Sequence, residues 1–484
     1  MSLGAALANA VTGLTANSRA AEVISNNVSN ALTPGYARRE LQISTRSVGG
    51  ATAGVKIDGI ERLQNKLTLA ALRSSTAAAA GAEVISTFYE KMESAFGLPG
   101  DANSLSGRYD AFDAALVAAM NDPASEAYMR TLADAAGDLA LGFKTLADGI
   151  QAERLAADRQ IATQVGQLNE ALVNIADLNK QIQEMRLRSD DISALLDQRQ
   201  LQIDRVASIV PIREIERQNG MVALYTTAGG VLLDGTPVEI EFSPVGVMVA
   251  DTTLASGALS GLSIDGRSIS VTGRGLYRGG SLEKLFQLRD QDAPALQSQL
   301  DALARDLVER FQDPTLDTTL TAGQAGLFTD GTGAFSATDE IGLSSRLRLN
   351  SLVDPSAGGE LWRLRDGLGA TAAGAPGNST LLEALTDRLR EVRLPASGDF
   401  LTAQKSAAEL AAELLSQVSQ ERLSAEDRTA ASNVRQSIAE QALARDGVDT
   451  DQEMQTLLTV QQAYAANARV IQALEELFDR LMEI

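Results

Sequence analysis

The chain has 484 residues and a formal net charge of −21, with 44% hydrophobic and only 4% aromatic residues. It contains neither cysteine nor histidine, which excludes disulfide frameworks, thiol catalysis, thiolate metal sites and histidine-based triads. A surface this acidic repels nucleic-acid phosphates and anionic membranes, so we expect neither as a partner. We also expect no cofactor, no bound metal and no enzymatic activity.

The first predicted element is a helix over residues 3 to 28. Apolar or small residues recur there at alternating intervals of four and three, which is the heptad pattern of a helix that buries one narrow stripe. The positions are Leu3, Leu7, Ala10, Leu14, Asn17, Ala21, Ile24 and Val28. Pro34 and Gly35 end the helix, because proline disfavours helical geometry at the preceding residue and glycine supplies a turn.

Long stretches of the middle of the chain are rich in Ala and Leu at helical spacing. We assign residues 41–210, 276–312 and 400–447 to one helical rod domain, a central bundle of long helices.

Two segments interrupt this helical pattern. Residues 211–275 are rich in Val, Ile, Thr and Gly, and turn signals such as Asn219-Gly220 predict a small antiparallel β domain. Residues 313–399 are rich in Gly, Thr and Asp without a clear period, which predicts a loop-rich or β-containing insert. Because helices flank both segments, we expect the β domain to project outward from the bundle.

The last predicted element repeats the heptad pattern of the first. Its seam residues are Leu457, Val460, Tyr464, Asn467, Ile471, Leu474, Phe478 and Leu481. Marginal heptad helices at opposite ends of one chain predict that residues 1–40 and 448–484 pair as a coiled-coil assembly domain, with an Asn in each seam to set the register. Separate docking of each helix on a globular core fits the pattern equally well. The predicted fold is mainly α with β inserts.

No motif in the chain predicts catalysis, and we assign no catalytic, cofactor-binding or metal-binding residues. The glycines of GRGLYRGG, residues 273–280, lack phosphate-loop spacing and the Lys-Ser or Lys-Thr that follows it, so we interpret this segment as a bend between strand and helix. Asp449, Asp451 and Glu453 alternate like EF-hand ligands, but the central Gly and the distal Glu are missing. Capping of the last helix explains these acids equally well.

Both ends of the chain resemble a known family. The stretch ISNNVSNALTPGY is similar to the Asn-rich signature N-N-x-x-N-x-x-T-P-G-Y of the rod, hook and hook-associated proteins of the bacterial flagellum. The matching positions are Asn26, Asn27, Asn30, Thr33, Pro34, Gly35 and Tyr36. The C-terminal stretch GVDTDQEMQTLLTVQQAYAANARVIQALEELFDRL is similar to the C-terminal helix of the same family. The two signatures stand in the family's order.

Two internal blocks resemble the hook-associated proteins of the hook–filament junction. They are LLDQRQLQIDRVA at residues 195–207 and GGSLEKLFQLRDQDAPALQSQLDALARDLVERFQ at residues 279–312. Gln200 departs from the family, which often has Asp there, and this change weakens a local charge pattern.

The resemblance implies a structural protein that self-assembles into the layer connecting hook to filament. It implies as partners further copies of the chain, the hook protein, a neighbouring hook-associated protein or flagellin, and an export chaperone on the C-terminal helix. It also implies an extracellular flagellar location, reached through the type III export channel; in agreement, MSLGAALANA has no basic leader and predicts no cleaved signal peptide. The alternatives are a hook or distal-rod protein, and an extracellular enzyme or adhesin carried on an insert.

Overall fold

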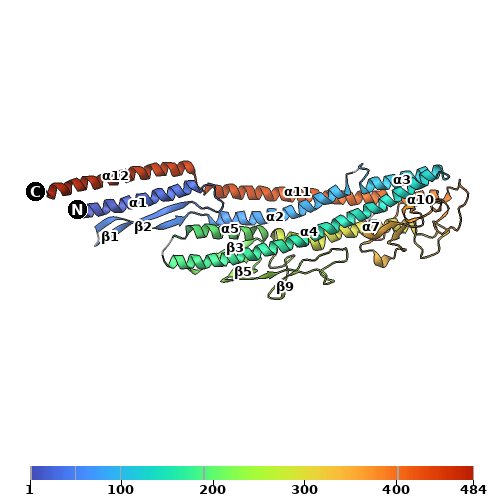
Figure 1. Cartoon of the computed structure of the whole chain (residues 1–484), viewed down its shortest axis with the longest axis horizontal. Coiled ribbons are helices and arrows are strands. Elements are labelled where there is room, and N and C mark those ends of the chain that lie inside the picture. Colours follow the sequence, from blue (N-terminus) through green and yellow to red (C-terminus); the bar gives the residue numbers. More distant parts are fainter. Residues whose placement is uncertain (1–2, 49–50, 99, 189–190, 401–402, 483–484) are drawn as a thin grey trace.

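The computed structural model of the chain describes residues 3–48, 51–98, 100–188, 191–400 and 403–482. The molecule is elongated and mainly helical, with several small antiparallel sheets. Its first helix α1 (Leu3–Ser29) and its last helix α12 (Thr450–Met482) run side by side at one end (Figure 1). Within the described part, no helix combines the length and apolar character needed to cross a membrane.

Long helices form the rod that extends from this end (Figure 1). The helix α4 (Glu126–Leu187) has 62 residues, and at about 1.5 Å per residue it reaches roughly 90 Å. Two other long helices, α2 (Lys66–Phe96) and α11 (Ala407–Arg445), pack lengthwise against each other. The shorter helices of the rod are α3 (Leu105–Asn121), α5 (Ser193–Ile209), α6 (Gly280–Gln287) and α7 (Ala293–Phe311), with a π turn at Leu288–Asp292 between the last two.

Side-chain caps fix where the rod helices begin. Asn65 accepts a hydrogen bond from the N–H of Leu67 at the start of α2, and Ser125 caps α4 in the same way. Ser406 and Glu409 form a reciprocal capping box at the start of α11. These contacts satisfy N–H groups that have no partner in a first helical turn, and a cap of this kind typically contributes about 1 kcal/mol.

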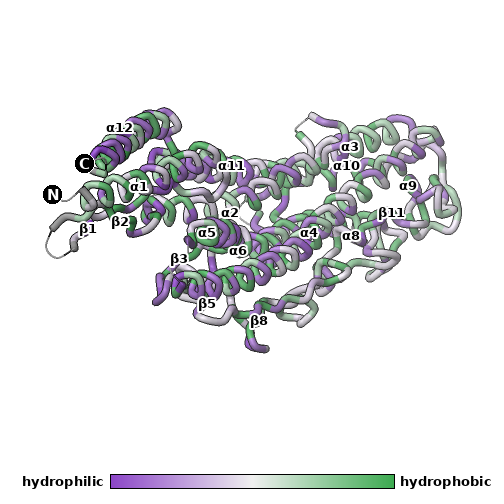
Figure 2. Tube along the Cα trace, turned by 60° about the vertical axis from the view of Figure 1, so that its left-hand side comes forward, coloured by the Kyte–Doolittle hydropathy of each residue, from purple (hydrophilic) through white to green (hydrophobic). Residues whose placement is uncertain are grey.

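One continuous cluster of buried apolar residues runs through the rod and both inserts. Away from the chain ends, Phe112 of α3, Phe311 of α7 and Phe328 of β10 (Phe328–Asp330) pack edge to face, with ring centroids 5.5, 5.8 and 5.9 Å apart. Figure 2 shows hydrophobic and hydrophilic positions alternating around the rod helices, as expected when one face of each helix lies in a core.

The β insert consists of two small antiparallel sheets. The first contains β3 (Ile212–Glu216), β4 (Val222–Thr226), β5 (Val231–Asp234) and β6 (Thr236–Pro237), and the second β7 (Ile240–Glu241), β8 (Leu262–Ile264) and β9 (Arg267–Ile269). A 3-10 turn (Gln218–Gly220) links β3 to β4.

The expectation that residues 211–275 project from the bundle is wrong, because both sheets lie along α4. The Asn179 side chain exchanges hydrogen bonds with the backbone of Val222 at 2.9 and 3.2 Å. Asn169 does the same with Ile240 at 2.8 and 3.0 Å. These amides satisfy strand-end groups, and the apolar side chains of the insert join the core of the rod.

The second insert, residues 313–399, mixes loops with short elements. It contains β10, which pairs antiparallel with β11 (Leu347–Leu349), the short helices α8 (Leu343–Arg346) and α9 (Arg363–Asp366), 3-10 turns at Ala337–Asp339 and Pro355–Ala357, and α10 (Thr380–Arg390). The sequence analysis did not anticipate α10, although its Leu382, Leu385 and Leu389 are buried at helical spacing. This helix packs on α3 and α7, so the insert is also part of the rod.

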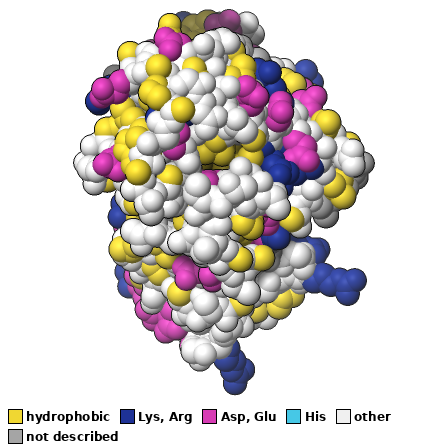
Figure 3. Space-filling view, turned by 90° about the vertical axis from the view of Figure 1, so that its right-hand side faces the viewer, with side chains coloured by type: hydrophobic (Ala, Val, Ile, Leu, Met, Phe, Trp, Pro, Cys, Tyr) yellow, Lys and Arg dark blue, Asp and Glu magenta, His cyan; other side chains and the backbone are white. Residues whose placement is uncertain are grey.

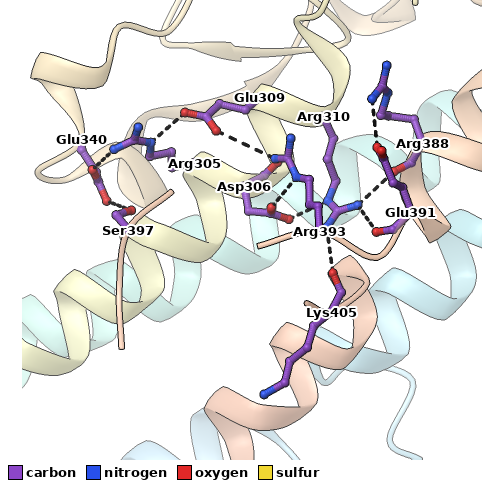
Figure 4. A network of polar contacts seen from close by, with 10 residues as sticks. All are labelled: Arg305, Asp306, Glu309, Arg310, Glu340, Arg388, Glu391, Arg393, Ser397 and Lys405. Carbon is purple, nitrogen blue, oxygen red and sulfur yellow. Dashed lines mark hydrogen bonds and ion pairs between the residues drawn. The ribbon is translucent and has the colours of Figure 1, made fainter. Parts of the chain in front are cut away.

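A buried ionic network fixes the C-terminal end of this insert to α7 (Figure 4). Arg310 is fully buried, and its guanidinium donates to the Asp306 carboxylate at 2.6 Å. It also donates to the backbone carbonyls of Arg388, Glu391 and Lys405 at 3.0, 2.7 and 3.2 Å. One buried cation therefore fixes the chain where it returns from the insert towards α11.

A β hairpin stands where the sequence analysis expected the rod to begin. The strands β1 (Arg39–Val48) and β2 (Ala51–Arg62) pair antiparallel, with Arg39 opposite Arg62 and register shifts near Gln42 and Thr45. The hairpin packs against α1 rather than against the long helices. The assignment of the first part of residues 41–210 to the helical rod is therefore corrected.

Candidate functional site

The two chain ends form one terminal unit, in which α1 lies between α12 and the hairpin (Figure 1). Gly13 lets the helices approach closely, because a Cβ at this position would lie 2.8 Å from Nδ2 of Asn467. On the other side of α1, the Thr12 hydroxyl accepts a hydrogen bond from the Val55 N–H of β2 at 3.2 Å. The seam residue Asn467 therefore does face α1, as a helix pair requires.

The predicted seam is only partly covered in a single chain. Ala10, Ile24 and Leu474 are buried, whereas Tyr464 and Phe478 remain 42% and 39% exposed. The other described seam side chains are half-buried: Leu7, Leu14, Asn17, Ala21, Val28, Leu457, Val460, Asn467 and Ile471. The side chains of Leu3 and Leu481 lie outside the described part. One copy of the chain thus leaves apolar seam surface for another molecule to cover.

Asn27 is the centre of the polar joint, the network of polar side chains that joins α1, the hairpin and α12 and reaches the rod through Asp197. Its side chain is 1% exposed. The amide Nδ2 donates to the Arg39 carbonyl at 2.8 Å and to Oε2 of Glu453 at 3.1 Å. Oδ1 accepts from the Tyr36 hydroxyl at 2.9 Å and from the Arg39 N–H at 3.0 Å. One buried amide therefore connects α1, β1 and α12.

Three ion pairs to two carboxylates extend the polar joint in opposite directions. Arg38 contacts Oε1 of Glu453 at 2.6 Å, and this carboxylate is only 2% exposed. Arg39 contacts Oδ2 of Asp197 on α5 at 2.6 Å, while Arg62 at the end of β2 contacts Oδ1 of the same carboxylate at 2.8 Å. Arg38 thus binds the hairpin to α12, and Asp197 binds it to the rod.

Gln200 completes the connection to the rod. Its Oε1 accepts from Arg62 at 2.6 Å and from Gln64 at 2.5 Å. The neutral amide does not contribute the charge that a carboxylate would, but it fills the same acceptor role beside Asp197. Gln200 therefore takes part in the polar joint through two hydrogen bonds.

Burial and neighbouring charges shift the pKa values of Tyr36 and Arg62 in this joint. Burial raises the pKa of the Tyr36 hydroxyl, while the Arg39 guanidinium, 4.7 Å from the centre of its ring, opposes the rise. Burial lowers the pKa of Arg62, and Asp197 opposes that change. Tyr36 therefore stays protonated at neutral pH and remains able to donate to Asn27.

The remaining residues of the N-terminal motif form the turn that connects α1 to β1. Asn30 donates to the Asn26 carbonyl at 3.0 Å, and the Thr33 hydroxyl donates to Oδ1 of Asn30 at 3.2 Å. Gly35 has φ +79°, and a Cβ there would lie 2.7 Å from Cγ of Leu201. Pro34 is exposed and lies in the turn, five residues after α1 ends at Ser29. The turn thus needs glycine both for its backbone angle and for its contact with α5.

The sequence analysis missed Arg38, Arg39, Arg62 and Asp197, and it interpreted Glu453 only as a capping acid. Asp449 is the residue that caps α12, accepting from the N–H groups of Asp451 and Gln452. The signal available in the sequence was the Arg38-Arg39 pair directly after the motif, in a chain otherwise dominated by acids. Its carboxylate partners lie 158 and 415 residues away, a separation that only the fold bridges.

The polar joint has no features of an active site. Its carboxylates are each occupied by guanidinium groups or amides. Among the residues that the structure describes, no group of acids could hold a metal ion. The arrangement serves instead to fix the direction of the terminal unit relative to the rod.

Three family models match the chain in order along the sequence. "Flagella basal body rod protein" matches residues 7–36, "Flagellar hook-associated protein FlgK helical domain" matches residues 89–327, and "Flagellar basal body rod FlgEFG protein C-terminal" matches residues 439–484. The terminal unit and the helical rod between these ends therefore define a flagellar axial protein.

Individual relatives point to one branch of this class. Flagellar hook-associated protein 1 of Salmonella typhimurium is 27% identical over 314 residues, which are 63% of this chain and 55% of that protein. Its counterpart from Bacillus subtilis is 23% identical over 509 residues, 98% of this chain and 97% of the relative. The solved structure of the flagellar hook junction protein FlgK from Burkholderia pseudomallei is 19% identical, with a TM-score of 0.43 over 54% of this chain and 46% of that one. The chain is thus similar to flagellar hook-associated protein 1 (FlgK).

Proposed function

We propose that this chain is a non-enzymatic structural component of the bacterial flagellum, and that its copies assemble into the layer connecting hook to filament. The observation that carries the proposal is the polar joint, in which Asn27 of the N-terminal motif and Glu453 of the C-terminal helix share a hydrogen bond. This contact joins the two chain ends, and Asp197 holds them on the rod through Arg39 and Arg62, so each copy presents a paired-helix unit at one end. The matches to hook-associated protein 1 support the junction as the location.

Residues 1–40 and 448–484, with the hairpin, would act as the assembly unit and pair as a coiled coil. Large apolar side chains of α12 remain exposed in a single copy, among them Leu458, Val470 and Leu477. Packing of neighbouring units would bury them, and full burial of such a side chain contributes about 1.5–3 kcal/mol. Self-association therefore has a source of free energy that the isolated chain lacks.

The other partners follow from the proposed location. The hook protein lies on one side of the layer, and a neighbouring hook-associated protein or flagellin on the other. The chain reaches its extracellular position through the flagellar type III export channel, and an export chaperone covers the exposed apolar residues of α12 beforehand. The rod, which begins after the hairpin, and its two inserts form the outer part of the layer.

An epitope inserted at Ala255–Gly257 tests this proposal, because this stretch of the β insert is exposed. Immunogold electron microscopy of isolated flagella should show one narrow band where hook meets filament. Label along the whole hook would instead identify a hook protein. Absence of label, with the epitope shown to be accessible on the purified chain, would contradict a flagellar position.

A hook or distal-rod protein is the second candidate, since both terminal matches are to rod-protein models. The match to the helical domain of FlgK over residues 89–327 favours the junction, because it covers the part of the chain that lies between those terminal signatures.

A further inference from the structure

The segment 273–279 between β9 and α6, here called the arginine loop, has an enforced backbone conformation. A Cβ at Gly275 would lie 2.1 Å from the carbonyl oxygen of Ser270, so no larger residue fits there. Gly279 has φ +98°, and a Cβ there would lie 2.5 Å from Cγ of Pro211. The sequence GRGLYRGG is therefore a tight bend, as predicted, whose shape depends on its glycines.

Side-chain contacts hold this bend against the first sheet of the β insert. Tyr277 is buried, and its hydroxyl donates to the Val231 carbonyl at 2.8 Å. The Thr226 hydroxyl donates to the carbonyl of Leu276. Because the backbone is fixed on both sides of Leu276, the positions from which the neighbouring side chains extend are preorganised, and little backbone freedom remains to be lost on binding.

The fixed bend directs its other side chains to solvent. Leu276 is 55% exposed between Arg274 and Arg278, which are both exposed. In the described part of the chain neither arginine forms an ion pair, and the Arg278 guanidinium donates to the carbonyl of Gly273, within the same loop, at 3.3 Å. In the end view of Figure 3, Lys and Arg side chains stand out along the lower edge, the side on which Figure 1 places the β insert.

We propose that the arginine loop is a preformed contact that binds an acidic surface on a second copy of this chain in the assembled layer. Charge complementarity identifies the partner, because 63 acidic residues against 42 basic ones leave each copy with a net charge of −21. That same charge repels nucleic acid and anionic lipid. Arginine is also one of the residue types enriched at the energetic centres of protein interfaces.

Such a contact joins unlike surfaces, a basic loop on one copy and an acidic face on the next. Head-to-tail contacts of this kind generate rings or helical arrays rather than closed dimers. The inference thus rests on the proposed assembly and adds to it a lateral contact outside the terminal unit.

Photo-crosslinking in isolated flagella tests the contact, and the absence of cysteine makes the label specific. Leu276→Cys, labelled with a maleimide photo-crosslinker, should give a product of twice the chain mass. Mass spectrometry should place its second half in an Asp- or Glu-rich peptide of the same protein. Arg274→Glu combined with Arg278→Glu should lower the yield roughly tenfold or more, because like charges then face each other.

The matched control reverses two exposed arginines elsewhere, Arg130→Glu with Arg435→Glu, and should leave the yield unchanged. Equal loss in both double variants would show that net charge alone matters and would overturn the inference. A crosslink only to a different flagellar subunit, or none in flagella that contain the chain, would overturn it as well. If immunoblots find no chain in flagella, the proposed function fails, and the inference that rests on it fails with it.

Discussion

Replacing Asn27 by alanine should loosen the contact among α1, β1 and α12 inside the terminal unit without unfolding the rod. The substitution removes three neutral hydrogen bonds and one to the Glu453 carboxylate, all made by a side chain that is 1% exposed. At about 0.5–1.5 kcal/mol for each neutral bond and about 1.5–3 kcal/mol for the charged one, the loss is roughly 3–7 kcal/mol. Local opening should become at least ~100-fold more frequent.

Native-state hydrogen exchange is the direct assay, because the Arg39 N–H donates to Asn27. We expect its exchange, and that of β1 and the first turns of α12, to accelerate by this factor while α4 exchanges as before. Asn30→Ala is the matched control, since Asn30 only contacts Asn26 and Thr33 within the exposed turn. Equal exchange of the Arg39 N–H in both variants would refute the central role of Asn27. Cells with Asn27→Ala should also form few filaments.

Three further changes test other parts of the structure. Arg310→Met leaves the buried Asp306 carboxylate with Arg393 as its remaining cation. Urea titrations should therefore show a free energy of unfolding that is lower by about 3–5 kcal/mol. A loss below about 1 kcal/mol would show that the network of Figure 4 contributes little to stability. Ile471→Asp with Phe478→Asp should abolish incorporation into flagella. The same changes at the exposed Val434 and Ile438 of the rod helix α11 should be milder, and equal effects would contradict the seam. Burial raises the pKa of the Asp301 carboxyl, so the folded chain binds the carboxyl proton more tightly than the unfolded chain does. The contribution of Asp301 to the free energy of unfolding therefore falls as pH rises from the ordinary carboxyl pKa to the raised one. The difference in stability between wild type and Asp301→Asn, measured from pH 3 to 7, should shift in favour of the variant over this interval, and a pH-independent difference would contradict it.

The ends of the chain were the most predictable part of the fold. Alternating intervals of three and four indicated both terminal helices, and α1 and α12 span the predicted seams. Local periodicity is sufficient for this, because a helix shows its buried face every three or four residues. The hairpin β1–β2 was missed, since its exposed residues include Ile43 and Ile57 and give no clean alternation of apolar and polar positions.

Local sequence also located the β insert, but not its placement. Turn signals and Val/Ile content identified the strands after Pro211, because hairpin turns require particular residues. Nothing local showed that Asn169 and Asn179 of α4 would hydrogen-bond those strands and hold them on the rod. The helix α10 was hidden for a similar reason: eleven residues inside a Gly-rich segment carry a weak periodic signal.

The sequence by itself determined the helical class, the acidic charge, the absence of Cys and His chemistry, and the terminal motif, because each of these is a property of composition or of neighbouring residues. Only the tertiary structure decided how the motif acts. Asn27, Arg38 and Arg39 meet Asp197 and Glu453 across hundreds of residues, and no periodicity encodes such a pairing. Buried polar groups are stabilising only when every partner is in place, and the fold is what brings the partners together.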